Sequence, residues 1–248
     1  MPQEPLFQLN AVSYQYNPEL KAVHCIDLAI HPSESVAILG ANGCGKSTLI
    51  KLLNGLLFPT SGTIKAFGET LTETSLRDMQ TAARFRRKTG FVFQNADAQL
   101  FSPTVREELA FAPLQMGLAR AETERRVQDI AELLRVTHLL ERSPFQLSGG
   151  EKRKVCLGCV LTINPEVLLL DEPTTGLDPR SQEELISLLR QLHGAGKTLI
   201  TATHDLSLAA RIATRCVVMN ESHEIAAQGE TGKILTDSRL LRSVNLTA

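Results

Sequence analysis

The chain lacks several features that would assign it to a familiar class. No apolar run in its 248 residues approaches the ~20 residues that a membrane-spanning helix needs, so any association with a membrane would occur by docking. The opening Met1–Pro5 has no basic region followed by an apolar one, and we expect no signal peptide. Basic residues are not in excess, because the formal net charge is -1, which argues against nucleic acid as the main partner.

Disulfide chemistry is also not indicated. The five cysteines are odd in number and scattered in spacing, which fits a reducing compartment better than a disulfide framework. Cys156 and Cys159 form a C-x-x-C pair, but no second pair of ligands follows and both lie within one predicted helix. We therefore expect these two thiols to pack in the core rather than to bind a metal.

The chain contains no repeat, low-complexity segment or long linker, and we expect one domain over residues 1–248. The first half predicts strands and helices that do not alternate regularly. The predicted strands are 7–16, 23–30, 35–40, 62–67 and 90–94, and the predicted helices are 47–57, a mostly helical 72–88, and 104–140 with breaks at Pro113 and near Gly117.

The second half alternates helix and strand. Helices are predicted at 149–161, 179–193 and 205–213, and strands at 167–171, 198–203 and 216–220. This alternation is typical of a parallel sheet with crossover helices, so the fold class is α/β with a mainly parallel core sheet. We expect a helical lobe over about 95–161 and a core lobe formed by about 1–94 and 162–248.

A glycine-rich segment with a lysine follows the strand predicted at 35–40. The run from Gly40 to Ser47 fits the pattern G-x-x-x-x-G-K-[ST], with an apolar strand before it and a helix after it. Its backbone N–H groups can surround phosphate oxygens at a helix N-terminus, Lys46 can reach the β and γ phosphates, and Ser47 can ligate Mg²⁺. The alternative, a glycine turn beside a surface lysine, is disfavoured by this strand-helix context.

Two carboxylates end the apolar strand at 167–171. In phosphate-loop enzymes an aspartate at this position, here Asp171, holds Mg²⁺ through water. Glu172 points to the other side of the strand path, where it can polarise an attacking water. A plain solvated strand end is the alternative, and the phosphate loop elsewhere in the chain disfavours it.

A second anion site is predicted at Leu147–Glu151, which reads Leu-Ser-Gly-Gly-Glu and opens a helix. A helix N-terminus with small residues and a hydroxyl attracts anions. Because one phosphate loop already serves one nucleotide, this second terminus suggests that it binds the nucleotide of a partner copy. A capped helix with a flexible entry is the alternative.

With these motifs the chain resembles the ATP-binding-cassette family over nearly its whole length. Tyr16 corresponds to the aromatic residue that stacks on adenine, and Gln94 to the glutamine that senses Mg²⁺ and the membrane partner. Asp178 corresponds to a loop that communicates across a dimer, and His204 to the histidine at the γ-phosphate. The signature that closes on the opposite subunit's ATP is Ser148, Gly149 and Gly150.

The resemblance implies a phosphate-loop NTPase with an N-terminal antiparallel β subdomain and a helical lobe that carries the signature. It implies an ATP-hydrolysing subunit with ATP and Mg²⁺ as cofactors, a second ATPase subunit, and membrane subunits that dock near Gln94–Pro113. The expected location is the cytoplasmic face of a membrane. The implied nucleotide contacts also include Gly40, Ala41, Asn42, Gly43, Cys44, Gly45, Lys46, Ser47 and Thr48. The implied catalytic residues are Glu172, His204, Gln94 and Lys46. The implied metal ligands are Ser47, Gln94 and Asp171.

Within the family, Phe93–Phe101 and Val105–Pro113 resemble the energy-coupling-factor ATPases, which drive uptake of cobalt, nickel or vitamins, and most of all the cobalt/nickel type. Ser33 departs from the family, which usually has a Gly-Glu turn before the first core strand. The alternatives are another ABC importer, an exporter, or a soluble cassette ATPase, which usually carries long insertions that this chain lacks. The sequence holds no site for the cargo.

Cys44 lies inside the phosphate loop. Because a neighbouring lysine and a helix N-terminus both lower the pKa of a thiol, the sequence predicts a reactive cysteine. We expect alkylation at Cys44 to block ATP binding, and MgATP to protect against it.

Overall fold

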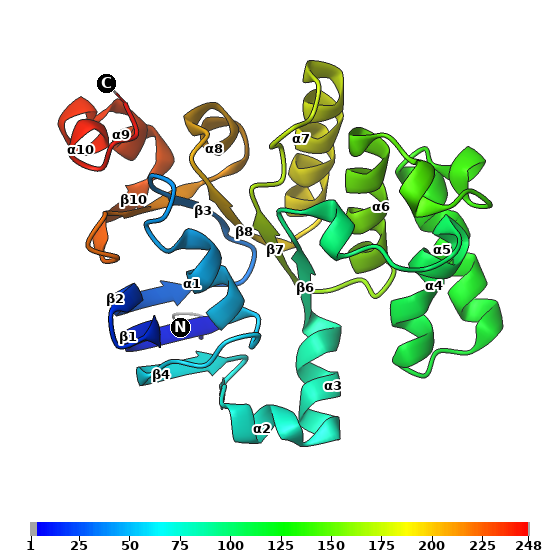
Figure 1. The fold of residues 1–248 in the computed structure, drawn as a ribbon, viewed down its shortest axis with the longest axis horizontal. Coiled ribbons are helices and arrows are strands. Elements are labelled where there is room, and N and C mark those ends of the chain that lie inside the picture. Colours follow the sequence, from blue (N-terminus) through cyan, green and yellow to red (C-terminus); the bar gives the residue numbers. More distant parts are fainter. Residues whose placement is uncertain (1–3, 248) are drawn as a thin grey trace.

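The computed structural model describes residues 4–247, so the first three residues of the segment considered as a signal peptide lie outside the described residues. The chain forms two β-sheets and a group of helices that projects from one side of the larger sheet (Figure 1). Within 4–247, every helix is too short or too polar to cross a bilayer.

The smaller sheet is antiparallel and comes from the N-terminal part of the chain. Its strands are β1 (Phe7–Asn17), β2 (Leu20–Ile30), β4 (Ser61–Ala66) and β5 (Glu69–Thr70), in the order β2-β1-β4-β5. The β1–β2 connection is a tight turn in which the Asn17 side chain accepts hydrogen bonds from the N–H groups of Glu19 and Leu20, at 3.1 and 2.8 Å. The expected antiparallel subdomain is confirmed.

The larger sheet is mainly parallel, as expected. Its strands are β3 (Ser35–Leu39), β6 (Thr89–Val92), β7 (Val167–Asp171), β8 (Thr198–Thr203), β9 (Arg215–Met219) and β10 (Ile225–Glu230), in the order β10-β9-β3-β8-β7-β6. Only β10, which pairs with β9, runs antiparallel to its neighbour among the strands described. Every residue of the central strands β3, β7 and β8 is buried, because both faces of a parallel sheet are covered.

Alternate residues of the central strands enter different cores. Ile38 of β3 and Leu169 of β7 pack with α1 (Lys46–Leu53) and the antiparallel sheet, so α1 is enclosed between the two sheets. Ala37 and Leu39 pack on the opposite face with α8 (Leu206–Ile212), α9 (Thr231–Thr236) and α10 (Ser238–Ser243). This period of two is the side-chain alternation of a strand.

The third core joins the projecting helices to the sheet. These helices are α4 (Val105–Gln115), α5 (Arg120–Leu133) and α6 (Gly149–Leu161), with short 3₁₀ turns at Ala96–Ala98, Thr137–Leu139 and Pro144–Gln146. Their apolar faces pack with Leu168 and Leu170 of β7 and with α7 (Pro179–Gly194). Figure 1 shows this group beside the free edge of β6.

Three details differ from the sequence expectations. Pro113 does not break α4, because it lies in the last turn before the helix ends at Gln115 and so removes only one late hydrogen bond. The mostly helical stretch expected over 72–88 consists of two helices, α2 (Glu73–Arg77) and α3 (Met79–Lys88), since Asp78 has an extended backbone and caps α3. Strand β10 and helices α9 and α10 were not predicted.

Ser33 stands where the family usually has glycine, and the structure gives a reason for that usage. Its backbone is left-handed, with φ 59, a conformation that disfavours most side chains. The Ser33 hydroxyl donates to the Gly196 carbonyl at 3.1 Å, and its N–H donates to the Thr198 hydroxyl at 2.9 Å. These two bonds tie the entry of β3 to β8 and offset part of the backbone cost.

Gly62 and Gly68 allow a matched test of backbone packing. Both have φ 82, but a Cβ at Gly62 would lie 2.3 Å from the Ala11 carbonyl oxygen, whereas a Cβ at Gly68 would meet nothing within 4 Å. We expect Gly68→Ala to lower the free energy of unfolding by about 1 kcal/mol through φ strain alone. Gly62→Ala should cost about 3 kcal/mol, because β1 must also move. Urea unfolding of the two variants measures the difference, and equal losses would contradict the close approach.

Candidate nucleotide site

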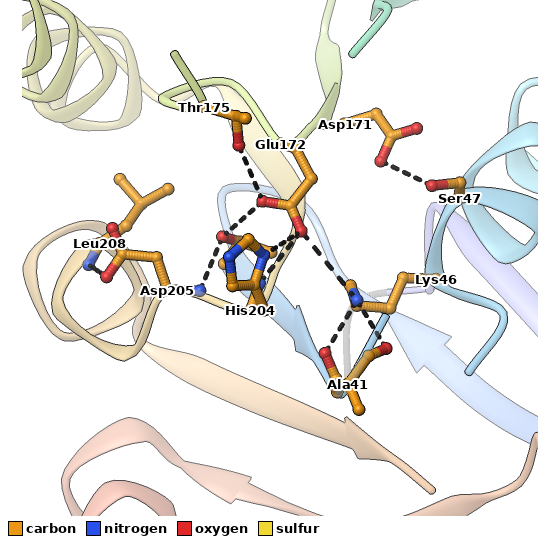
Figure 2. Close-up of polar contacts among 11 residues, drawn as sticks. Ala41, Lys46, Ser47, Asp171, Glu172, Thr175, His204, Asp205 and Leu208 are labelled. Atoms are coloured by element: carbon orange, nitrogen blue, oxygen red, sulfur yellow. Dashed lines mark hydrogen bonds and ion pairs between the residues drawn. The ribbon is translucent and has the colours of Figure 1, made fainter. Parts of the chain in front are cut away.

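The phosphate-loop residues, the two carboxylates and the histidine of the predicted site follow three neighbouring strands. Strands β3, β8 and β7 are adjacent and parallel, so their carboxyl ends lie at one edge of the sheet. The glycine-rich loop follows β3, Asp171 and Glu172 end β7, and His204 follows β8. Figure 2 shows that these side chains converge, which the order of the motifs along the chain could not establish by itself.

The loop after β3 closes around the Lys46 ammonium group. Lys46 Nζ donates to the carbonyls of Gly40 at 2.8 Å and Ala41 at 3.0 Å, and its side chain is 6% exposed. Gly45 precedes α1 with φ 107, and a Cβ there would lie 2.0 Å from the Ala22 carbonyl oxygen. Only glycine fits this approach to β2, so the loop N–H groups can gather at the start of the helix.

Ser47 and Asp171 form an oxygen pair beside the loop. The Ser47 hydroxyl donates to Asp171 Oδ1 at 2.9 Å. Asp171 is 4% exposed, and burial raises the pKa of its carboxyl, although the bond from Ser47 opposes this. A hydroxyl and a carboxylate at this separation are hard oxygen donors of the kind that Mg²⁺ prefers.

Both carboxylate oxygens of Glu172 accept hydrogen bonds from the protein, so this strand end is not a plain solvated one. Its Oε1 accepts hydrogen bonds from the backbone N–H of His204 at 3.1 Å and from His204 Nδ1 at 2.8 Å, and it lies 4.0 Å from Lys46 Nζ. Its Oε2 accepts from the Thr203 hydroxyl at 3.2 Å and the Thr175 hydroxyl at 3.4 Å. The carboxylate is thus only 7% exposed and aimed along the same edge as Lys46 (Figure 2).

This network also defines the tautomer of His204. A carboxylate only accepts hydrogen bonds, so His204 Nδ1 carries the proton that binds Glu172. The other ring nitrogen, Nε2, is left for another partner, and the side chain is 51% exposed.

A pocket of about 430 Å³ lies in front of the loop. Tyr16 stands at its side, 49% exposed, with its hydroxyl 3.2 Å from that of Thr48. Gln94 also lines the pocket, and its backbone carbonyl accepts a hydrogen bond from Arg153 at 2.8 Å. The predicted residues that line this pocket are Tyr16, Asn42, Gly43, Gly45, Lys46, Ser47, Thr48, Gln94 and Glu172.

His223 lines the same pocket and was missed by the sequence analysis. It lies in the turn between β9 and β10, far from every motif along the chain, and no spacing pointed to it. Its only local signal would have been a position just after a strand of the parallel sheet.

The signature residues form a separate group. Ser148 caps α6 in a capping box with Glu151, and Asp178 caps α7 through the Ser181 N–H at 3.0 Å. A Cβ at Gly150 would lie 2.8 Å from the Ser181 hydroxyl, so the starts of α6 and α7 are close together. Within residues 4–247, the pocket lining includes neither Ser148, Gly149 and Gly150 nor Asp178. The structure therefore does not join the two predicted groups in one copy.

The prediction of a reactive Cys44 is wrong. The side chain is 2% exposed and its sulfur packs toward Gly40, where a Cβ would lie 2.4 Å away. Burial raises the pKa of the Cys44 thiol, and the nearby Lys46 charge offsets only part of that effect. Cys156 is also buried, as expected, and burial raises its pKa to about 12.

Sequence comparisons show the family. The family model described as ABC transporter matches residues 23–175, more than half of the chain. A putative ABC transporter ATP-binding protein of Methanosarcina acetivorans is 48% identical over 244 residues, covering 97% of this chain and 88% of that protein. The nickel import ATP-binding protein NikO of Rhodobacter capsulatus is 45% identical over 245 residues, covering 98% and 96%. The chain belongs to the ABC transporter family.

Solved structures agree with this assignment. The cbiO1 protein of Clostridium perfringens, part of the ABC transporter complex cbiONQ, superposes with a TM-score of 0.83 at 33% identity, covering 98% of this chain and 96% of that one. A dimeric ATP-binding cassette in a post-hydrolysis state with ADP and Pi gives a TM-score of 0.80 at 28% identity, covering 91% and 98%. The chain is thus an ATP-binding, ATP-hydrolysing subunit of an ABC transporter.

The cysteine environments predict which thiol reacts. Cys25 is exposed, whereas Cys44 is buried with a raised pKa. In the native protein at pH 8, a disulfide reagent such as DTNB should modify Cys25 in a fast phase, and Cys44 at least tenfold more slowly, because little of its thiol is both accessible and ionised. Cys25→Ser should remove the fast phase and Cys44→Ser should retain it. Rapid modification of Cys44 in the Cys25→Ser variant would restore the original expectation.

Proposed function

We propose that this chain hydrolyses ATP to energise an importer of the energy-coupling-factor type, with cobalt or nickel ions as the cargo. The observation that carries the catalytic part is Glu172, a buried carboxylate held beside Lys46 and His204 at the mouth of the loop pocket. The chemistry would be in-line attack of water on the γ-phosphate, which depends mainly on positioning and charge neutralisation.

In this proposal the loop from Gly40 to Thr48 wraps the phosphates while Tyr16 stacks on the base. Lys46 exchanges its bonds to the loop carbonyls for the β and γ phosphates. Glu172 orients the water, and His204 presents Nε2 toward the γ-phosphate because Nδ1 is committed to Glu172. Adjacent negative charge on phosphate and carboxylate is balanced by Lys46, which lies near both.

The oxygen donors also fit Mg²⁺. The hydroxyl of Ser47 and the carboxylate of Asp171 are already 2.9 Å apart, and the Gln94 side chain lines the same pocket. These three residues would hold the ion, which when bound would supply charge neutralisation for the β and γ phosphates.

The proposal requires two copies or two homologous subunits. The signature group around Ser148 and Gly150 lies apart from the loop pocket of its own chain, and its helix N-terminus carries partial positive charge. A head-to-tail dimer would let that group close on the γ-phosphate held by the partner, with Asp178 at the contact. The dimeric cassette with ADP and Pi to which this chain is similar supports this arrangement.

We further propose that two lobes of the single domain of residues 1–248 have different roles. The core lobe, about 1–94 and 162–248, would hold nucleotide, and the helical lobe, about 95–161, would carry the signature. Membrane subunits would dock near Gln94–Pro113, where Phe101 and Phe111 are 59% and 42% exposed and stack edge to face at 4.8 Å. Exposed aromatic side chains are favoured in protein interfaces. The chain would then lie peripherally at the cytoplasmic face of the membrane.

Substitution of the carboxylate tests the catalytic role. Glu172→Gln should retain ATP binding but lower kcat by on the order of 10²–10³, because an amide cannot polarise water. Size-exclusion chromatography with MgATP should show the variant as a closed dimer. Glu166→Gln, at an exposed position just before the same strand, is the matched control and should remain active. Near-normal hydrolysis by Glu172→Gln would remove this residue as the base.

The cargo requires transport measurements with the membrane partners. We expect vesicles containing the complete complex to accumulate radioactive Ni²⁺ or Co²⁺ on addition of ATP, and vesicles with Glu172→Gln to accumulate neither. The similarity to two proteins named as nickel import ATP-binding proteins supports metal over vitamin cargo. ATP-driven uptake of a vitamin alone would overturn the metal assignment, and ATP-driven efflux would overturn import.

A further inference from the structure

We propose that His223 is a positioning residue of the phosphate loop, which sets the direction of the Gly45 N–H through the peptide between Cys44 and Gly45. This inference rests on the nucleotide position proposed above. The two partners are distant in sequence, and the contact exists only because β9 lies next to β3 in the core sheet.

The contact itself is a hydrogen bond to the loop backbone. His223 Nδ1 lies 3.1 Å from the Cys44 carbonyl oxygen. A carbonyl only accepts, so Nδ1 carries the proton and donates it. The turn that bears the ring is anchored on both sides: the His223 N–H donates to the Asn220 carbonyl at 3.1 Å, and the His223 carbonyl accepts from the N–H of His24 on β2 at 2.9 Å.

Because of peptide geometry, this hydrogen bond to the Cys44 carbonyl also fixes the direction of the Gly45 N–H. In a planar trans peptide the C=O and the following N–H point in opposite directions. When His223 holds the Cys44 carbonyl, the Gly45 N–H must therefore point away from the ring. Gly45 opens α1 and lines the pocket, where an N–H group can meet a phosphate oxygen.

The peptide between Cys44 and Gly45 needs such a hydrogen bond, because little else opposes the rotation that would reverse its C=O and N–H. Rotation of a peptide plane changes ψ of the residue before it and φ of the residue after it, and glycine accepts φ of either sign. Gly45, with φ 107, therefore imposes little barrier of its own. Glycine is required there by the close approach of Ala22, so orientation has to be supplied from outside the loop.

The backbone of His223 is left-handed, and this determines which substitutions can test its side chain. Its φ is 65, a left-handed conformation that glycine would adopt without strain. The adjacent Glu224 carboxylate binds His24 Nδ1 at 2.7 Å and further fixes the turn.

Two substitutions distinguish the loss of the His223 hydrogen-bond donor from a loss of folding stability. His223→Gly removes the donor and relieves the backbone strain, so it should not lower the temperature of unfolding. His223→Asn places an N–H donor, Nδ2, the same number of bonds from the backbone as Nδ1, and asparagine tolerates a left-handed backbone. Binding of MgADP to the full-length chain by isothermal titration calorimetry gives the affinity without turnover.

We expect His223→Gly to bind MgADP about tenfold more weakly, the effect of misaligning one hydrogen bond to a charged group. His223→Asn should return within about threefold of the unaltered chain, on the same scale. Equal affinity of His223→Gly and the unaltered chain, or equal weakness of the Gly and Asn variants, would overturn the inference.

A third variant tests the proposed nucleotide position independently of the role of His223. Lys46→Ala should abolish detectable MgADP binding at the loop. If Lys46→Ala binds normally, the proposed nucleotide position fails. If Lys46→Ala loses binding while His223→Gly does not, only the role of His223 fails.

Discussion

The buried pairing of Lys46 with Glu172 is the interaction on which the site depends. The two charges lie 4.0 Å apart and each is less than a tenth exposed. Removing charges from water is costly unless each has several partners, and here loop carbonyls hold the lysine while His204 and two hydroxyls hold the glutamate. Because the two residues follow different strands, the register of the core sheet must be kept for the charges to balance.

A second constraint is the separation of the two anion-attracting helix termini. The start of α1 faces the loop pocket, whereas the start of α6 lies beside that of α7, where Gly150 leaves room for Ser181. The starts of α6 and α7 are each capped by a side chain, Ser148 and Asp178, whereas the start of α1 at Gly45 has no side-chain cap. A chain built in this way is organised to act across an interface, and the proposed dimer follows from that separation together with the similarity to a dimeric cassette.

Local sequence was sufficient where structure is governed by neighbours in the chain. Strands β3, β7 and β8 and helices α6 and α7 were predicted because their apolar runs and capping residues are contiguous. Prediction from local sequence failed where the structure depended on residues distant in the chain or on where an element ends. Cys44 was expected to be reactive from its neighbours along the loop, but tertiary packing buries its sulfur. Pro113 looked like a helix break because its distance from the helix end was unknown.

By itself the sequence determined the chemical kind of the site, since a glycine loop, a lysine and paired carboxylates carry their roles in their own functional groups and immediate spacing. Only the tertiary structure decided how these groups meet. Strand order brings Asp171 to Ser47 and Glu172 to His204, and it sets His223 against the Cys44 carbonyl. The physical reason is that strands adjacent in a parallel sheet are separated in the chain by whole helices, so contacts across the sheet edge leave no periodic trace in the sequence.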